Sequence, residues 1–523
     1  MTANNSQARI AELIRAHERL LFLRAYPRNP AMLRRTEKLL ASFQKRVERL
    51  HRSGADLSPL EEPEVSGIAG TGFSAIFSYE VVRRLLELEP GRIKADWERY
   101  EVTDRLAGLW RRLLPLVEED TMVEAHVPYL EWLGRAAGGL DNALAWLVAC
   151  LEELPVSSKE RAELYASLEL PVRWELGDSM AARTAIARPS RQIFYHQGPL
   201  IRRGEVSIER ELASGPLTVE RVDAESGPAF LNMALATSAA RYRELRGFTF
   251  GDPNSVLHAG AGRGVEIFLC GVPSGQRLPL RAYHAAMIFK NGVPVGYFET
   301  LSLFERMEVG FNLYYTFREG ETAWLFARVL HLFQQILGTT SFSIEPYQIG
   351  LDNEEAIQSG AFWFYRKLGF RPVLPAVSEL LRREESRLRQ KPGYRSSAST
   401  LRKLAAGHLV FETPAAPQGE WDRFSARNVA LATLARKPEE AAASVSRALG
   451  IRAGAHAEFA SLSLVLDLIP GLGDWPPAEK AALVDIIRAK MGPDETLYVR
   501  LMQGHGRLRD AIRKLGSAPA TSD

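Results

Sequence analysis

A long hairpin in the middle of the chain constrains the possible folds more than any other feature of the sequence. Apolar and polar residues alternate over 280–289, and the run ends in Lys290-Asn291-Gly292. An Asn-Gly pair is the strongest short signal for a two-residue hairpin turn, because both residues tolerate the left-handed backbone that this turn requires. The run 294–303 then returns. The sequence therefore predicts an antiparallel pair of strands at 280–289 and 294–303.

Short β-type runs and helical runs around this hairpin predict one sheet domain over 190–380. The β-type runs before the hairpin are 192–195, 206–212 and 217–222. The glycine-rich stretch 258–264 has no helix after it and is expected to be a flexible loop. After the hairpin, strands are expected at 308–317 and 340–344, and helices at 323–337 and 353–368. Strands in sequence followed by two strand–helix alternations indicate a mixed sheet of the α/β (α+β) class.

Helical patterns flank the sheet domain, and no internal repeat is evident. Residues 1–185 are predicted to form a helical region, in which 73–88 and 93–114 are two of the expected helices. The remaining segments are expected to be a linker and charged segment at 381–420, a second helical region at 421–515 and a disordered tail at 516–523.

Composition and charge exclude several classes of protein. The chain has 523 residues, 46% of them hydrophobic and 25% charged, and a formal net charge of +3, which is too small to indicate a nucleic-acid partner. It contains only two cysteines, which fits a reducing compartment. The first residues lack the pattern of a signal peptide, and no apolar run approaches the roughly 20 residues of a membrane span. We therefore expect a cytoplasmic protein without a membrane span.

One of the expected helices carries four aromatic residues in a row, from Phe362 to Tyr365. Ala361 and Tyr365 lie four residues apart and therefore share one face of the helix. Gly369 supplies the residue just after the helix end, and Pro372 prevents the helix from resuming. By itself, this pattern is typical of a buried amphipathic helix that packs on a sheet.

The order of elements over 215–375 resembles that of the GNAT superfamily of acyl-CoA N-acyltransferases. The terminal helix–strand motif of that family is represented by Ala361, Tyr365, Lys367, Gly369 and Phe370. The return strand of the hairpin is similar to the family strand that carries a glycine before an aromatic residue, here Gly296 and Tyr297. The turn 318–325 occupies the place of the family's pyrophosphate loop. The resemblance covers less than a third of the chain.

This resemblance implies an acyl-CoA as co-substrate, no metal, and an amine acceptor that is a small molecule or a peptide. In the family, the fourth strand diverges from the fifth and its exposed backbone pairs with the acyl carrier. The diphosphate of the carrier lies at the N-terminus of the following helix. The positions that the resemblance assigns to carrier binding are Asn312, Tyr314, Tyr315, Thr316, Phe317, Arg318, Gly320, Thr322, Ala323 and Lys367.

The resemblance also assigns catalytic roles. Tyr365 matches the general acid that protonates the leaving thiolate, and a phenol with a pKa of about 10 keeps its proton at working pH. Glu299, Glu308 and His284 are candidates for the base that deprotonates the amine. Each of these four residues equally fits a structural role in a sheet or core, and the sequence leaves both interpretations open.

Two acidic residues depart from the family pattern. Glu321 stands where the family usually has glycine, and Glu319 lies two residues before it. Acids in a first helical turn stabilise the helix dipole, and they would compete with a diphosphate for the same N–H groups. Asn353 is expected to be a helix cap rather than a contact of the carrier.

Two alternative functions therefore stay open beside the acyltransferase. In the first, the domain is a catalytically inactive GNAT-like fold that binds a ligand or acts as a scaffold, and the helical flanks bind a protein partner. In the second, a related fold transfers an aminoacyl group from a charged tRNA, which would require a more basic surface. No Ser-His-Asp, Cys-His or metal-ligand spacing indicates another class of enzyme.

Overall fold

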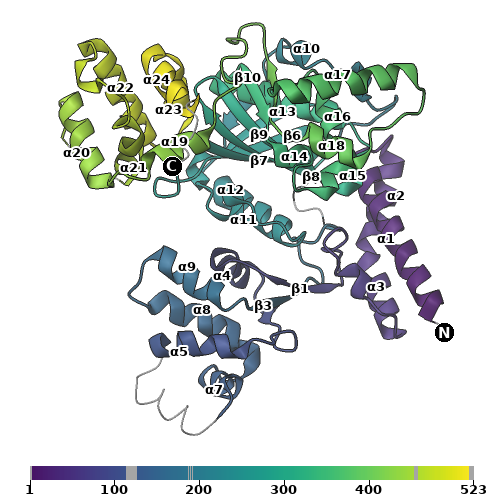
Figure 1. The fold of residues 1–523 in the computed structure, drawn as a ribbon. Coiled ribbons are helices and arrows are strands. Elements are labelled where there is room, and N and C mark those ends of the chain that lie inside the picture. The colour runs from purple at the N-terminus through teal and green to yellow at the C-terminus, as the bar shows by residue number, and fades with distance from the viewer. Residues whose placement is uncertain are drawn as a thin grey trace. The chain divides into compact units, whose positions relative to one another are not determined.

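The computed structural model describes residues 3–113, 127–185, 188, 190, 192–452 and 457–517. The chain divides into two units. Unit 1 comprises Met1–Gln197, Glu225–Thr249 and Asn291–Val293, and unit 2 comprises Gly198–Ala224, Phe250–Lys290 and Pro294–Asp523. The architecture is mixed α/β, with a large mixed sheet and flanking helices, as the sequence predicts (Figure 1).

Unit 1 combines helices with a small antiparallel sheet. The strands β1 (Gly72–Ile76), β2 (Ile93–Ala95) and β3 (Pro171–Glu175) pair in the order β1-β3-β2. The described α-helices of unit 1 are α1 (Ala3–Ala25), α2 (Pro30–Ala41), α3 (Phe43–Arg52), α4 (Tyr79–Leu88), α5 (Ala107–Leu113), α7 (Tyr129–Ala136), α8 (Ala143–Glu153), α9 (Ser158–Ser167), α11 (Ser226–Ala239) and α12 (Arg246–Thr249).

The small sheet corrects the prediction that 1–185 is helical throughout. The segments expected to begin helices at 73 and 93 begin with strands instead, and residue 114 lies outside the described residues. Trp174 of β3, whose side chain is fully buried, lies opposite Phe73 in one neighbouring strand and Ile93 in the other. This long-range pairing of apolar residues outweighs the local helical pattern.

Unit 2 is built around a mixed sheet with the strand order β11-β12-β10-β9-β8-β7-β6-β5-β4. Its strands are β4 (Thr218–Arg221), β5 (Leu257–Gly262), β6 (Val265–Cys270), β7 (Ala282–Lys290), β8 (Val293–Leu303), β9 (Arg306–Leu313), β10 (Ser341–Ile344), β11 (Arg371–Pro372) and β12 (Leu409–Glu412). The α-helices before and around the sheet are α10 (Ile208–Leu212), α13 (Thr322–Leu337), α14 (Pro346–Ile349), α15 (Glu354–Ser359), α16 (Ala361–Arg366), α17 (Pro375–Gln390) and α18 (Ala398–Leu404).

The predicted hairpin is confirmed. β7 and β8 are neighbours in the sheet and are joined by the turn Asn291-Gly292. Both turn residues have positive φ angles, 50° and 78°, as a type I′ turn requires. Every residue of β7 is buried, so this strand belongs to the interior of unit 2.

The segments before the hairpin differ from the prediction. The run 206–212 forms no strand: Ile208–Leu212 are the helix α10, which the hydroxyl of Ser207 caps by accepting from the Arg210 N–H at 3.3 Å. Residues 192–195 form no strand. The N–H and C=O of Phe194 bind the side chain of Asn291, at 2.8 and 3.0 Å, where a partner strand would otherwise be needed.

The stretch 258–264 is not a flexible loop. It supplies most of β5 and the tight turn that leads into β6, and both strands pair antiparallel. Arg263 and Gly264 in this turn have positive φ angles of 51° and 72°. The glycines that suggest flexibility therefore serve a hairpin turn, where the left-handed backbone favours them.

The segment 381–420, expected to be a linker, contributes a strand to the sheet. β12 pairs antiparallel with β10 on one side and with β11 on the other. Phe411 of β12 lies opposite Phe342 of β10, and both side chains are buried. The helix expected at 353–368 is also divided in two, because Gly360 takes a left-handed backbone with φ of 67° between α15 and α16.

A second group of helices, drawn in yellow-green to yellow in Figure 1, ends the chain. These helices are α19 (Ala426–Thr433), α20 (Pro438–Leu449), α21 (Ala457–Leu466), α22 (Pro477–Lys490), α23 (Thr496–Gln503) and α24 (Gly506–Ser517). The last described helix thus extends beyond 515, and residues 518–523 of the predicted tail lie outside the described residues.

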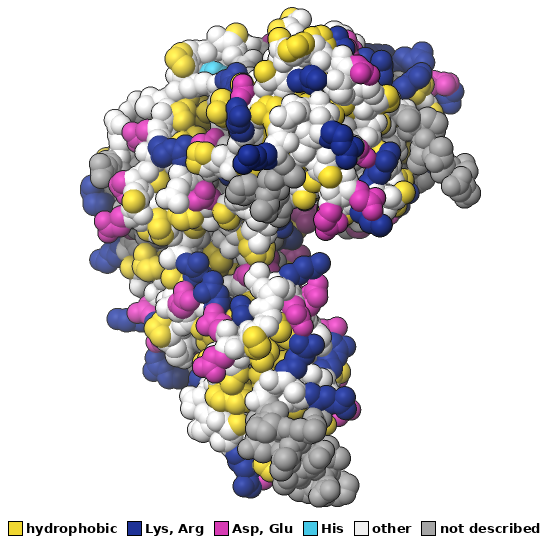
Figure 2. Space-filling view, turned by 90° about the vertical axis from the view of Figure 1, so that its left-hand side faces the viewer, with side chains coloured by type: hydrophobic (Ala, Val, Ile, Leu, Met, Phe, Trp, Pro, Cys, Tyr) yellow, Lys and Arg dark blue, Asp and Glu magenta, His cyan; other side chains and the backbone are white. Residues whose placement is uncertain are grey.

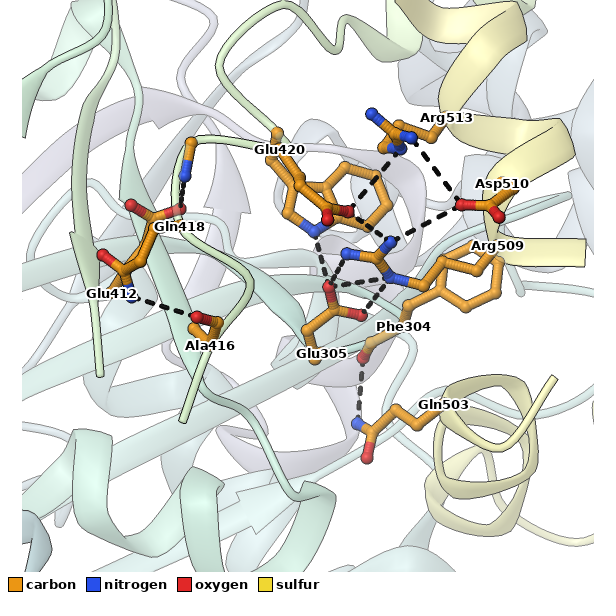
Figure 3. A network of polar contacts seen from close by, with 12 residues as sticks. Phe304, Glu305, Glu412, Ala416, Gln418, Glu420, Gln503, Arg509, Asp510 and Arg513 are labelled. Atoms are coloured by element: carbon orange, nitrogen blue, oxygen red, sulfur yellow. Dashed lines mark hydrogen bonds and ion pairs between the residues drawn. The ribbon is translucent and has the colours of Figure 1, made fainter. Parts of the chain in front are cut away.

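A network of charged and aromatic side chains joins these helices to the sheet (Figure 3). Glu305, in the turn between β8 and β9, accepts hydrogen bonds from Arg509 of α24 at 2.9 and 3.0 Å and from the indole of Trp421 at 2.7 Å. Arg509 also donates to Glu420 at 2.6 Å. The amide of Gln503 donates to the C=O of Phe304 at 2.9 Å. The C-terminal helices are therefore an integral part of unit 2.

Candidate active site

β9 and β10 separate partway along their length. They pair in parallel from Arg306 and Ser341 to Val309 and Ile344. β9 then continues to Leu313 along β8, whereas the chain leaves the sheet after Ile344 and enters α14. The last four residues of β9 therefore have no β10 residue beside them.

A glycine in β8 sets the geometry of this divergent end. A Cβ atom added to Gly296 would lie 2.4 Å from the Asn312 carbonyl oxygen and 2.6 Å from Cδ2 of Leu313. Real Cβ atoms do not approach backbone oxygens so closely, so any larger residue at 296 would displace the end of β9.

A cavity of about 240 Å³ opens where the two strands diverge, between the end of β9 and the helices α15 and α16. We call it the divergence cavity. Its lining includes Asn312, Arg318, Thr322, Ala361 and Tyr365, five residues that the sequence predicts at a carrier site or in its motif.

Tyr365 lies in the wall of the divergence cavity and is 3% exposed. Its ring meets Phe326 of α13 at 5.5 Å and Phe370 at 5.7 Å, both edge-on. Burial raises the pKa of Tyr365, so the phenol keeps its proton throughout the neutral and mildly basic range. The hydroxyl oxygen is itself buried and has no hydrogen-bond partner among the described residues, so the structure provides a protonated hydroxyl group within the wall of this cavity.

A second cavity of about 470 Å³, here called the loop cavity, lies at the N-terminus of α13. It shares Arg318, Thr322 and Phe364 with the divergence cavity, and Arg202 and Arg203 bring two further guanidinium groups. Among the described residues, no side chain forms a capping hydrogen bond at the start of α13. The first N–H groups of a helix and its dipole favour an anion, and the arginines reinforce this preference.

Arg318 connects the two cavities. Its guanidinium group pairs with Glu355 and lies 4.0 Å from the centre of the Tyr315 ring. Glu319 also lines the loop cavity, so one acidic residue stays near the helix N-terminus. A bound anion would have to draw Arg318 away from Glu355.

Glu321 does not act as the sequence suggests. Its side chain is fully buried and pairs with Arg263 and with Lys290, the latter at 3.1 Å. It also accepts the N–H of Ile201 at 3.2 Å. The expectation that Glu321 competes for the N–H groups at the start of α13 is therefore wrong, because two cations and a loop amide already occupy its carboxylate.

A third cavity of about 210 Å³ brings together two of the predicted base candidates, and we call it the acid cavity. Glu299 and Glu308 line it, and Glu345, which directly follows β10, adds a third carboxylate. The Tyr283 hydroxyl donates to Glu299. Gln348 of α14 lines both the acid cavity and the divergence cavity, so the two cavities adjoin at this residue.

The acid cavity lies on the face of the sheet opposite α13. Phe298 and Phe311, which are paired in β8 and β9, both contact Phe326 of α13. Their strand neighbours Glu299 and Gly310 line the acid cavity. Successive residues of a strand point to opposite faces, so α13 and the acid cavity occupy different sides.

The three carboxylates of the acid cavity differ in their affinity for protons. Burial raises the pKa of Glu299, although the hydrogen bond from Tyr283 opposes this effect. Burial and the charge of Glu308 raise the pKa of Glu345. Burial would also raise the pKa of Glu308, but His408 at 3.8 Å and the nearby arginines lower it overall. Glu299 and Glu345 therefore titrate closer to neutral pH than Glu308 does.

His284 is not part of this site. It follows Tyr283 in β7 and therefore points to the opposite face, where its ring lies 6.2 Å from that of Phe333 of α13. Burial lowers the pKa of His284 to about 4. It lines none of the cavities above, so the structure does not bring it together with Glu299 and Glu308.

The segment after β9 also departs from the prediction. The strand expected at 308–317 ends at Leu313, and Tyr315–Phe317 form a 3₁₀ turn. The predicted carrier-binding residues that line none of the cavities above are Tyr314, Tyr315, Thr316, Phe317 and Lys367. Gly320 and Ala323 do line the loop cavity. Asn353 caps α15 as predicted, since its side chain accepts from the Ala356 N–H at 3.1 Å.

Sequence reasoning missed several residues of the site. Arg202 and Arg203 lie between the predicted strands 192–195 and 206–212, and Glu345 and Gln348 lie between two other predicted elements. One signal was present for Glu345, because polar residues that directly follow a parallel strand often face a ligand. The arginines gave no such signal, since nothing local indicates that their loop meets α13.

In comparisons with protein-family models, curated proteins and solved structures, nothing matches this chain. Within the described ranges, no group of three or more His, Cys, Asp or Glu side chains is placed to bind a metal ion. No described helix combines the length and the apolar character needed to cross a bilayer. Figure 2 shows basic and acidic side chains interspersed over the visible face, without the single-sign surface typical of nucleic-acid binding.

Proposed function

We propose that the protein is an N-acyltransferase that moves an acyl group from an acyl-CoA to an amine. The observation that carries this proposal is the divergence of β9 from β10, with two cavities beside the end of β9 that adjoin at Gln348. Such an opening would let an acyl carrier in one cavity meet an amine in the other. The resemblance of the sequence to the GNAT superfamily supports the same reaction.

The divergence cavity and the loop cavity together would hold the carrier. The amide arm would pair with the free edge of Gly310–Leu313, in place of a strand. The diphosphate would lie at the start of α13, where Arg202, Arg203 and Arg318 can donate charge-assisted hydrogen bonds. The negative charge of Glu319 would repel the diphosphate in part. The carrier would therefore need additional binding energy from its amide arm.

The chemistry would proceed by direct attack. Glu345 or Glu299 accepts a proton from the ammonium form of the amine, directly or through a water molecule. The amine nitrogen then attacks the thioester carbon, a C–N bond forms, and a backbone N–H of β9 stabilises the oxyanion. As the C–S bond breaks, the nitrogen releases its excess proton to solvent, and the sulfur receives a hydrogen bond and then the proton of Tyr365, which regains a proton from solvent.

A raised pKa makes Tyr365 a weaker acid than a free phenol, but it also ensures that the proton is present. We therefore expect the variant Tyr365→Phe to lose activity near the lower end of the ~10²–10⁴-fold range of general acids. Its affinity for acyl-CoA should stay the same, because the ring still packs against Phe326. Single-turnover kinetics with the phenylalanine variant would test this role, and a rate within about twofold of the wild type would exclude it.

Calorimetric titration with acetyl-CoA and longer acyl-CoAs tests the proposal as a whole. The variant Arg318→Glu should weaken binding about tenfold or more, because it replaces a donor by a like charge beside the diphosphate. Arg389→Glu, which makes the same charge change at an exposed position of α17, should have no effect. If the wild type binds no acyl-CoA, the hypothesis of an inactive ligand-binding or scaffold protein replaces that of an enzyme. The ion pair of Arg318 with Glu355 favours this second hypothesis, because it engages the arginine that would bind the diphosphate.

A further inference from the structure

The acid cavity continues along β9 into a fourth cavity of about 460 Å³, here called the arginine cavity. Leu301, Glu308 and Glu345 line both cavities, so they form one groove. Arg281, Arg306 and Arg427 also line the arginine cavity. The groove therefore begins among carboxylates at the strand divergence and ends among guanidinium groups.

Arg306 is unusual because it is buried and forms no direct ion pair with any acidic side chain that the structure describes. It is the first residue of β9 and is 8% exposed. Its Nε and Nη2 atoms donate to the Ser343 hydroxyl at 3.3 Å, and Nη1 has no hydrogen-bond partner among the described residues. Its guanidinium group lies 5.7 Å from the centre of the Phe424 ring.

A buried guanidinium group without a counter-ion is costly, and natural proteins retain such groups where a ligand completes the charge pair. Arg281 differs, because it lies 3.6 Å from the Glu308 carboxylate. Within the described chain, Arg306 forms no ion pair. The structure thus contains a buried cation that lines a cavity, with the carboxylates of Glu308, Asp422 and Glu412 in its surroundings but none of them in a direct ion pair with it.

Strand geometry gives the distance between this cation and the acidic end of the groove. Arg306, Glu308 and Gly310 alternate along β9 and therefore share one face, with a spacing of about 6.5–7 Å for every two residues. On β8, Leu303 lies opposite Arg306 and Leu301 lies opposite Glu308. An amine beside Glu308 would consequently have apolar side chains beneath it, and the next residue on the same strand face, about 6.5–7 Å away along β9, would be Arg306.

We propose that the acyl acceptor is an amino acid with an apolar side chain, and that Arg306 binds its carboxylate while its amine lies beside Glu308 and Glu345. A carboxylate fits better than a phosphate, because the three acidic residues Glu308, Glu345 and Asp352 line the same cavity and would repel a dianion. A planar carboxylate also matches the fork of a guanidinium group. The identity of the acceptor rests on the proposed function, whereas the carboxylate site rests on Arg306 itself.

Calorimetry in the presence of saturating coenzyme A tests the inference without any turnover. The probes are L-leucine and L-phenylalanine, each compared with its amide, L-leucinamide and L-phenylalaninamide. We expect the wild type to bind at least one acid about tenfold or more tightly than its amide. Equal binding of both acids and their amides, or no binding of either acid, would overturn the proposal, and neither result depends on a variant that folds.

The variant Arg306→Gln should remove the preference for the acid and leave amide binding unchanged, and Arg306→Lys should restore part of the preference. Arg389→Gln is the matched control. A preference that survives in Arg306→Gln would show that another group binds the carboxylate and would overturn the assignment. Acyl transfer to amines without a carboxylate would leave the proposed function standing and refute this inference. If the amino acids bind through Arg306 but no acyl-CoA binds, the carboxylate site would stand and the proposed acyltransferase function would be refuted.

Discussion

The buried cluster around Glu321 allows a prediction whose magnitude follows from the structure. Glu321 and Lys290 are both 0% exposed, and their side chains are 3.1 Å apart. Lys290 also donates to the C=O of Arg263 at 2.6 Å. The substitution Glu321→Gln keeps the shape of the side chain and removes its charge, so it tests the ion pairs without creating a cavity.

Lys290 determines the size of the effect. Burial lowers the pKa of Lys290 to about 8, even though the charge of Glu321 raises it. At pH 7 the wild-type lysine therefore keeps its proton, and removing that proton costs ~1.4 kcal/mol per pKa unit. In Glu321→Gln the pKa of Lys290 falls further, so the amine discharges. The lost pair with Arg263, which is 30% exposed, adds ~1 kcal/mol after solvent screening.

We therefore expect Glu321→Gln to lower the local free energy of unfolding by ~2–3 kcal/mol at pH 7. This is less than the ~3–5 kcal/mol typical of a broken buried ion pair whose remaining residue stays charged. The folded-state pKa of Lys290 lies below its unfolded value, so stability rises with pH from the folded pKa to the unfolded one. This rise begins near pH 8 in the wild type and at lower pH in the variant. The difference between the two proteins should consequently shrink from pH 6 to pH 9.

Native-state hydrogen exchange of peptides from β7 and the start of α13 measures this effect, because it reports local opening in a chain with two units. A loss of ~2–3 kcal/mol corresponds to roughly 30- to 150-fold faster exchange. The double variant Glu321→Gln with Lys290→Met should exchange about as slowly as the wild type, since no buried charge is left. Exchange within threefold of the wild type, or a difference that does not depend on pH, would refute the reasoning.

Two further predictions concern unit 2. Gly296→Ala should lower the free energy of unfolding by ~1–3 kcal/mol and weaken acyl-CoA binding, because the new Cβ displaces the end of β9. Gly260→Ala in β5 is the control, since no atom lies within 4 Å of its new Cβ. This control should behave like the wild type in thermal unfolding and calorimetry. Arg509→Met should loosen α24. The pKa of Glu305 is lowered because the hydrogen bonds from Arg509 and Trp421 outweigh burial, so its stabilisation is complete above about pH 4.5 and is lost in more acidic solution. Exchange protection of α24 should therefore fall between pH 5 and pH 3 in the wild type and stay low in the variant; an unchanged acid dependence in Arg509→Met would contradict this.

The parts of the fold that the sequence predicts well are those that local chemistry determines. The turn Asn291-Gly292 needs a left-handed backbone at two successive residues, and few other pairs allow it. The motif from Ala361 to Phe370 likewise places Tyr365 in the cavity wall, because a helical face and a glycine stop are both local properties. The interruption at Gly360 was missed, since a single glycine within a helical pattern is often tolerated.

The parts that the sequence does not reveal depend on residues far apart in the chain. Glu321 is partnered by Lys290 and Arg263, which precede it by 31 and 58 residues, so its neighbours alone suggest an exposed helix start. β12 is short and follows a charged stretch, and its apolar residues gain a partner only when β10 is already in place. Arg306 was overlooked because a lone arginine at a strand end is normally solvated.

The insertion of β12 between β10 and β11 has a consequence for biosynthesis. When the ribosome has made the chain as far as β11, β10 still has one open edge, and β11 has no neighbour of its own. Leu409–Glu412 emerge only after α17 and α18, a delay of several seconds at ~5–20 residues per second. During that interval the nascent sheet presents unpaired backbone groups on β10, which another chain could bind. A chaperone that covers the nascent chain, or slower translation between β11 and β12, would therefore change the yield of native protein. The same chaperone or slower translation after Glu412 should change the yield less.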